Sequence, residues 1–198
     1  MSETERPTFY YDLSSPYAWL AAERINSVLP VPPVWKPISY GFVIRHTGAT
    51  PWSMRPGREV GMAEIERRAA ERGLPELRWP QGWPVETYSL PALRAATFAQ
   101  EVGKVVSFSL AAFRQQFNGG RGLDQIDNVL IAAASCELHP QAVLKAIERQ
   151  AIKDRLREAT GDAIERGVTG VPTVRIGDQL FWGDDRLEQA AAALEATT

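Results

Sequence analysis

The chain of 198 residues contains one cysteine, Cys136, and two histidines. A single cysteine cannot form an internal disulfide and excludes a C-x-x-C redox pair, and the lack of a cysteine–histidine cluster argues against a structural zinc site. Cys136 shares the apolar face of a helical pattern with Val129 and Ala133, so we predict that it is buried in the core. We therefore expect neither redox chemistry from the chain's own thiols nor a bound metal.

The chain also lacks an excess of charge and any long apolar run. Lysine and arginine total 22 against 24 acidic residues, a formal net charge of −2, which gives no general attraction to nucleic acid or to an anionic membrane. No segment approaches the roughly 20 apolar residues that cross a bilayer, and residues 1–7 lack the apolar segment of a secretion signal. We expect a soluble, cytoplasmic protein whose partner is a small molecule.

Residues 9–20 carry the most informative local pattern. A short run of strand-forming residues, with two tyrosines, leads into Ser14-Ser15-Pro16 and then into an apolar pattern of helical period that extends to Leu29. Ser15 is suited to cap this helix, and Pro16 stands where a proline costs a helix nothing. The cap would create a small electropositive site for a thiolate or a carboxylate, although these residues equally suit an ordinary helix start.

Further elements follow in a recognisable order. Residues 34–38 favour a second strand, and residues 39–56 favour an irregular loop that forms a lid or a wall of a site. A charged helix is expected from Gly57 to about residue 73, residues 79–84 are too rich in proline for a regular element, and helical patterns dominate from 90 to 163.

The C-terminal part returns to strands. Residues 173–176 and 179–182 are joined by Gly177-Asp178, which predicts a hairpin. Asp184 or Asp185 is then expected to cap a final helix. The order is βαβ, then helices, then ββα.

This order resembles the thioredoxin arrangement of DsbA-like proteins. The resemblance implies an α/β thioredoxin-like fold with a large all-helical insertion, in which residues 1–44 and 166–198 form a discontinuous domain around an inserted helical domain of residues 45–165. Gly170-Val171-Pro172-Thr173 resembles the cis-proline loop that faces the active site of that superfamily.

Three motifs together resemble the 2-hydroxychromene-2-carboxylate isomerases and the kappa-class glutathione transferases. They are D-x-x-S-P-Y-A-W-L at 12–20, G-V-P-T at 170–173 and W-G-D-D-R-L at 182–187. The resemblance implies a site for glutathione or another low-molecular-weight thiol, with Ser15 stabilising the thiolate, Val171 and Pro172 pairing with the cysteinyl backbone, and Asp184 and Asp185 binding the γ-glutamyl end.

The resemblance also implies residues around these motifs. Arg58 stands where the kappa pattern has a lysine that meets the glycyl carboxylate, although a solvated helix-face charge is the competing interpretation. Trp52, Trp79, Trp83 and Tyr88 are candidates for an aromatic substrate pocket, and each also suits a structural role in the core. A homodimer is implied by the resemblance alone.

Our leading hypothesis is a thiol-dependent isomerase of the hydroxychromene-carboxylate type, acting on a small aromatic or electrophilic substrate through reversible addition of the cofactor thiolate. A kappa-like transferase that conjugates electrophiles is the close alternative. A non-catalytic thioredoxin-like module that binds peptides or thiols is the alternative from another class. A serine hydrolase is poorly supported, because Ser15 has no G-x-S-x-G context and no histidine placed to act as its base.

Overall fold

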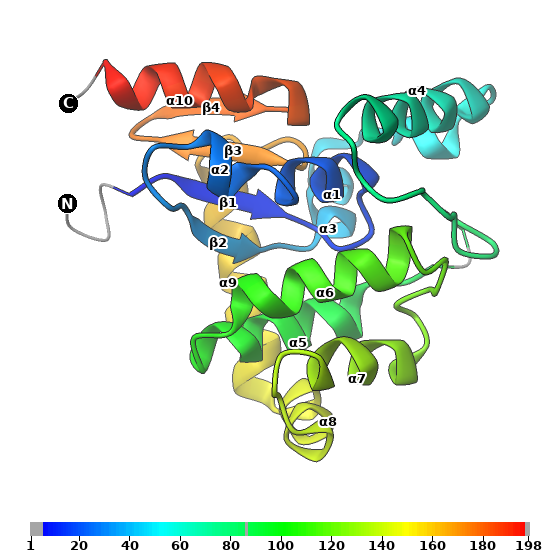
Figure 1. The fold of residues 1–198 in the computed structure, drawn as a ribbon. Helices are drawn as coiled ribbons and strands as arrows, with labels where there is room; N and C mark the ends of the chain where they lie inside the picture. Colours follow the sequence, from blue (N-terminus) through cyan, green and yellow to red (C-terminus); the bar gives the residue numbers. More distant parts are fainter. Residues whose placement is uncertain (1–5, 86, 197–198) are drawn as a thin grey trace.

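A computed structural model describes residues 6–85 and 87–196 of the chain (Figure 1). The strands are Thr8–Tyr11 (β1), Val34–Pro37 (β2), Thr173–Ile176 (β3) and Gln179–Trp182 (β4). The α-helices are Pro16–Ala22 (α1), Ile25–Val28 (α2), Tyr40–Thr47 (α3), Arg58–Glu71 (α4), Leu90–Glu101 (α5), Val105–Phe117 (α6), Ile126–Ala134 (α7), Pro140–Glu148 (α8), Gln150–Glu165 (α9) and Leu187–Glu195 (α10). Two short 3-10 helices are Trp52–Met54 (η1) and Asp184–Arg186 (η2).

The strands form one mixed sheet in the order β2-β1-β3-β4. Strand β1 runs parallel to β2 and antiparallel to β3, with Thr8 opposite Val34 on one side and Arg175 on the other, and β3 runs antiparallel to β4. The N-terminal βαβ unit and the C-terminal ββα unit therefore share a sheet, which confirms the thioredoxin-like arrangement expected from the order of elements.

Strand β1 is buried on both faces. Phe9 and Tyr11 point to one side, where their rings contact Trp35 with centroid separations of 5.0 and 5.4 Å. Tyr10 points to the other side and belongs to a smaller apolar cluster with Val171. Alternation of side chains along a strand accounts for this division, so both faces of the sheet are covered.

The helices lie on different sides of the sheet (Figure 1). Helix α10 packs on β3 and β4, whereas α5 and α9 contact β2 and belong to the block of helices at the other end of the molecule. The division at residues 44 and 45 falls within α3, and the two-domain description stays a prediction. Within the described residues, no helix is both long and apolar enough to cross a membrane. Cys136 is 7% exposed, which confirms that it is buried.

Two local predictions are wrong. The segment expected to be an irregular loop contains helix α3, which ends at Gly48 in the left-handed conformation, φ 68°. Gly41, Gly48 and Pro51 favoured a loop in this segment, and only Val43 on the helix is buried. The first helix is also shorter than expected, because helical structure is interrupted at Glu23 and Arg24, between α1 and α2.

One buried hydrogen bond joins the sheet to the helical block. The hydroxyls of Tyr11, at the end of β1, and Ser109, on α6, lie 2.6 Å apart and are both fully buried. Burial raises the pKa of Tyr11, so this hydroxyl keeps its proton under ordinary conditions.

We predict that Tyr11→Phe lowers the free energy of unfolding by about 1–2 kcal/mol, because it leaves the Ser109 hydroxyl buried without its partner. Chemical denaturation would measure this. The Tyr11→Phe and Ser109→Ala double variant should lose less stability than the sum of the two single variants. Strict additivity would show that the two hydroxyls do not interact.

Candidate functional site

Ser15 is the residue before helix α1, at the end of the short turn that follows β1. Its backbone is extended, φ −90° and ψ 117°, and its Oγ accepts a hydrogen bond of 3.2 Å from the amide of Ala18. Pro16 is the first helical residue. Ser15 is therefore an N-cap, as the sequence predicted, and because its oxygen accepts the capping bond, its hydroxyl hydrogen can be donated to a group in front of it.

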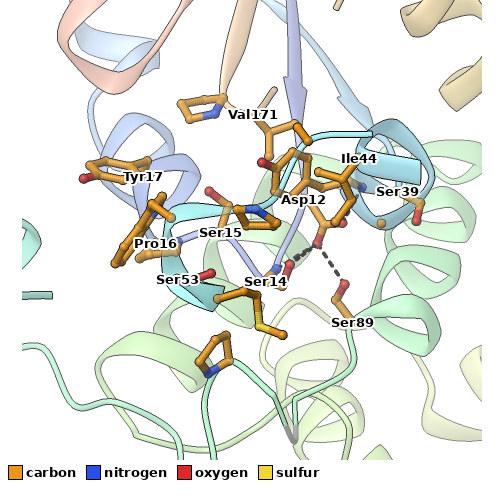
Figure 2. Close-up of a pocket in the computed structure, with 18 of the residues that line it drawn as sticks. Asp12, Ser14, Ser15, Pro16, Tyr17, Ser39, Ile44, Ser53, Ser89 and Val171 are labelled. Carbon is orange, nitrogen blue, oxygen red and sulfur yellow. Dashed lines mark hydrogen bonds between the residues drawn. The ribbon is translucent and has the colours of Figure 1, made fainter. Parts of the chain in front are cut away.

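Asp12 lies three residues before Ser15 and is only 2% exposed. Its Oδ1 accepts hydrogen bonds of 2.8 Å from the amide and hydroxyl of Ser14 and from the hydroxyl of Ser89, and its Oδ2 accepts one of 2.8 Å from the amide of Tyr40 (Figure 2). Burial raises the pKa of the Asp12 carboxyl, although these hydrogen bonds oppose the rise. Asp12 belongs to the D-x-x-S-P-Y-A-W-L motif, but its local sequence predicts no role for it.

A cavity of about 790 Å³ opens in front of these residues. Figure 2 shows Tyr17 and Ile44 on opposite sides of Ser15, with Val171 above it. The walls come from segments far apart in sequence, which are the turn and start of α1, helix α3 with the loop and η1 that follow, the segment before α5, the cis-proline loop and the start of η2. The volume is typical of a site for a small organic molecule.

The cis-proline loop forms one wall of this cavity. The Val171–Pro172 peptide bond is cis, and the carbonyl of Pro172 accepts a 3.0 Å hydrogen bond from the amide of Gly183. A side chain at Gly170 would collide with the indole of Trp182, so the loop packs closely on β4. Within the described residues, neither the amide nor the carbonyl of Val171 is bonded to another backbone group, which leaves both available to a ligand.

Asp184 and Asp185 have different surroundings. Asp184 is 1% exposed, and its Oδ1 and Oδ2 lie 2.7 Å from Arg68 on α4 and 2.6 Å from Arg72, the residue that follows α4. Asp185 is exposed, although both aspartates contribute to the cavity lining. The prediction that either aspartate caps the final helix is wrong, because α10 begins at Leu187 without a side-chain cap.

The predicted aromatic residues divide into two groups. Trp52, Trp83 and Tyr88 line the cavity, whereas Trp79 is not among the described lining residues and lies behind Trp83 with ring centroids 4.5 Å apart. The Trp79 indole donates a 2.7 Å hydrogen bond to Glu66, so its contacts are structural.

Arginine contributes differently from the prediction. The described residues that line the cavity do not include Arg58, whose side chain lies 3.7 Å from Glu59 at the start of α4. Arg45 and Arg68 line it instead. Sequence reasoning missed both, because nothing in the local sequence distinguishes them from other charges on a helix surface.

Comparison with known proteins agrees with this geometry. A family model described as a DSBA-like thioredoxin domain matches residues 8–195. The chain belongs to this family.

Two named relatives are similar to this DSBA-like chain along most of its length. The 2-hydroxychromene-2-carboxylate isomerase of Sphingobium xenophagum is 28% identical over 194 residues, covering 93% of this chain and 95% of that protein. Glutathione S-transferase kappa 2 of Caenorhabditis elegans is 28% identical over 200 residues, covering 92% of this chain and 88% of that protein. Both names are those of enzymes, and the resemblance inferred from the three motifs is confirmed.

A solved structure supports the assignment of the fold. A 2-hydroxychromene-2-carboxylate isomerase superposes with a TM-score of 0.85 at 22% identity, covering 96% of this DSBA-like chain and 95% of the other. This likeness shows that the two share a fold that includes the helical insertion. The present chain has Ser14-Ser15-Pro16-Tyr17 between β1 and α1 and no C-x-x-C pair anywhere in its sequence.

We predict that Asp12→Asn lowers the free energy of unfolding by about 1–3 kcal/mol at neutral pH. If the amide oxygen keeps the three donors that meet Oδ1, the new NH₂ group faces the amide of Tyr40 and leaves that buried donor without an acceptor. Ser89→Ala, which removes one of the three donors to Oδ1, is the matched control and should cost less. Equal losses in denaturant titrations would contradict this account.

Proposed function

We propose that this protein is an isomerase of the 2-hydroxychromene-2-carboxylate type that uses glutathione or a similar low-molecular-weight thiol. One observation carries the proposal. The Ser15 hydroxyl and the unpaired backbone of Val171 face one cavity, in a chain that matches such isomerases over nine-tenths of its length. This is the arrangement that a bound cysteinyl thiol needs, with a donor for the sulfur and a strand edge for the peptide.

The residues present fit a tripeptide thiol. A glutathione backbone could donate to the Val171 carbonyl and accept from its amide, in the manner of an added β-strand. Asp185 offers an exposed carboxylate for the ammonium of the γ-glutamyl end. Arg68 lines the same cavity and stands beside Tyr17, with its guanidinium 5.7 Å from the ring centroid.

Bound glutathione would supply a nucleophilic thiolate, which the chain itself lacks at this site. Ser15 donates its hydroxyl hydrogen toward the sulfur and favours the charged form of the thiol, which lowers the pKa of that thiol. Trp52 and Trp83 line the cavity that would hold this sulfur, and their ring centroids are 5.7 Å apart. In a partly dry cavity, a hydrogen bond to a charged sulfur is stronger than in water.

The remaining site residues either position the binding groups or are candidates for contact with a ligand. Asp184 holds the start of η2 against α4 through its two arginine partners, and thereby positions Asp185. Pro172 fixes the loop that presents Val171. Arg58 remains a predicted contact for the glycyl carboxylate, although it is not among the described residues that line the cavity. Tyr88, which is 59% exposed, is the candidate for contact with the aromatic part of a substrate.

A kappa-class transferase activity is the second candidate, favoured by the similarity to the kappa enzyme over most of both chains. It would use the same thiol activation but leave the sulfur bonded to the electrophile.

The proposal also includes a cytoplasmic location and a homodimer. Light scattering on the purified protein would test the dimer.

We predict that the wild-type protein binds glutathione with release of a proton at neutral pH, and that Ser15→Ala loses the proton release. The thiol would then have no hydroxyl donor and would keep its own proton. Calorimetric titration in two buffers of different ionisation enthalpy measures the proton count. Turnover should fall roughly 100-fold, as for loss of one oxyanion donor.

Ser53→Ala is the matched control, because Ser53 is also a largely buried hydroxyl that lines the cavity. It should leave both proton release and turnover close to the wild-type values. Binding that is unchanged in Ser15→Ala, without proton release in any variant, would favour the non-catalytic thiol-binding module. No binding of glutathione by the wild type would direct the search to another thiol.

We predict that the protein interconverts a hydroxychromene carboxylate and its ring-opened trans isomer in the presence of catalytic glutathione. The thiol should not be consumed, because an isomerase returns it after each turnover. Absorbance of the product and a thiol assay on the same sample give the two readings. Consumption of glutathione with an aryl halide, without isomerisation, would favour the transferase.

A further inference from the structure

The cavity wall contains two cationic side chains among the described residues, Arg45 and Arg68. Arg68 is already neutralised, because its Nη1 lies 2.7 Å from Asp184 and its Nε lies 2.6 Å from Glu64. These pairs fix the guanidinium beside α1 and leave it little capacity for a second anion.

Arg45 differs from Arg68 in having no such ion pairs among the described residues. In the part of the chain that the structure describes, its guanidinium has no ion pair or hydrogen bond with a protein group, and it lies 5.4 Å from the ring centroid of Phe42. Stacking on an aromatic ring orients a guanidinium and leaves its in-plane N–H groups free for a carboxylate. Arg45 therefore has an unused charge with a preferred orientation.

The surroundings of Arg45 suit an aromatic anion. Helix α3 carries Arg45, Phe42 and Ile44, and Figure 2 shows Ile44 on the opposite side of Ser15 from Tyr17, the residue beside Arg68. Phe42 and Met54 line the same cavity and are 45% and 53% exposed. Exposed apolar groups beside an unpaired cation are the complement of a flat apolar molecule with a carboxylate.

We propose that Arg45 is a specificity-determining residue that binds the carboxylate of an aromatic substrate, while the thiol occupies the part of the cavity between Ser15 and the cis-proline loop. The inference rests on the proposed function. It adds that the cavity has two parts. Residues of α1, α4 and the cis-proline loop bind the thiol, and α3 selects the substrate by its charge.

Two probes that differ only in the carboxylate test this assignment. Benzylidenepyruvate and benzylideneacetone share the aromatic enone, and only the first carries a carboxylate. Binding is measured by calorimetry with saturating S-methylglutathione, which has no free thiol to react with the enone. The wild type should bind the acid more tightly than the ketone.

In Arg45→Gln, the dissociation constant of benzylidenepyruvate should rise roughly 10-fold, the lower end of the range for a hydrogen bond to a charged group, and that of benzylideneacetone should not change. Arg45→Lys should retain part of the preference, since it keeps the charge and loses the planar fork. Arg157→Gln is the control for general electrostatics. Arg157 borders a separate small hollow that also includes Arg45, outside the main cavity, and pairs with Asp154.

Equal affinity of the wild type for the two probes, or a preserved preference in Arg45→Gln, would overturn the assignment. A separate glutathione titration distinguishes this failure from failure of the proposed function. If Arg45→Gln weakens glutathione and leaves the probes unaffected, Arg45 belongs to the thiol site and the assignment is wrong. If glutathione binds normally and only the acid probe is lost, the assignment is supported.

Discussion

The buried carboxylate of Asp12 is the constraint on which the geometry of the site depends. A carboxyl group without partners would be costly to bury, and four donors from three separate segments meet this one. Those donors belong to Ser14, Tyr40 and Ser89, so one side chain fixes the turn before α1, the start of α3 and the residue before α5. Ser15 adjoins Ser14 in this turn and lines the cavity.

Neutralisation of charge divides the cavity into groups that hold the structure and groups that are available to a ligand. Asp184 belongs to the motif that the family resemblance connects with ligand binding, yet its contacts with Arg68 and Arg72 place it among the structural groups. Removal of one partner from such a buried pair would leave an uncompensated charge, so we expect substitution of Asp184 to be destabilising. Asp185 and Arg45 keep their charges unpaired by contrast, within the residues described, and are the polar groups from which ligand selectivity can arise.

The features that the sequence predicted correctly are those that depend on residues close together in the chain. The serine cap, the hairpin with glycine in its turn and the proline of the cis-proline loop each depend on neighbouring residues, and each is found at the expected place. Helix α3 was missed because Gly41, Gly48 and Pro51 favour a loop, and the acceptor for its first amide is Asp12, 28 residues away. The pairing of Arg68 with Asp184 spans 116 positions and could not be read from either segment alone.

Arg58 illustrates a different limit. Its predicted role came from its place in the kappa pattern, and a shift of a few residues on a helix moves a side chain to another face. The structure places Arg68, ten positions later on the same helix, at the cavity wall. The family pattern thus pointed to the helix that also places Arg68 at the cavity wall, and the contact expected of Arg58 stays a prediction.

The turn between β1 and α1 carries Ser15 and no cysteine, so it offers no thiol of its own to act as a nucleophile. A serine hydroxyl has to lose its proton to attack, and no histidine is among the described residues that line this cavity to accept one. Ser15 already accepts a hydrogen bond from Ala18, which leaves it the role of donor. A donor at this position stabilises a negative charge that arrives from outside the chain. Under the proposed function, this turn therefore holds the thiol of another molecule, and the cavity beside it decides what that thiol meets.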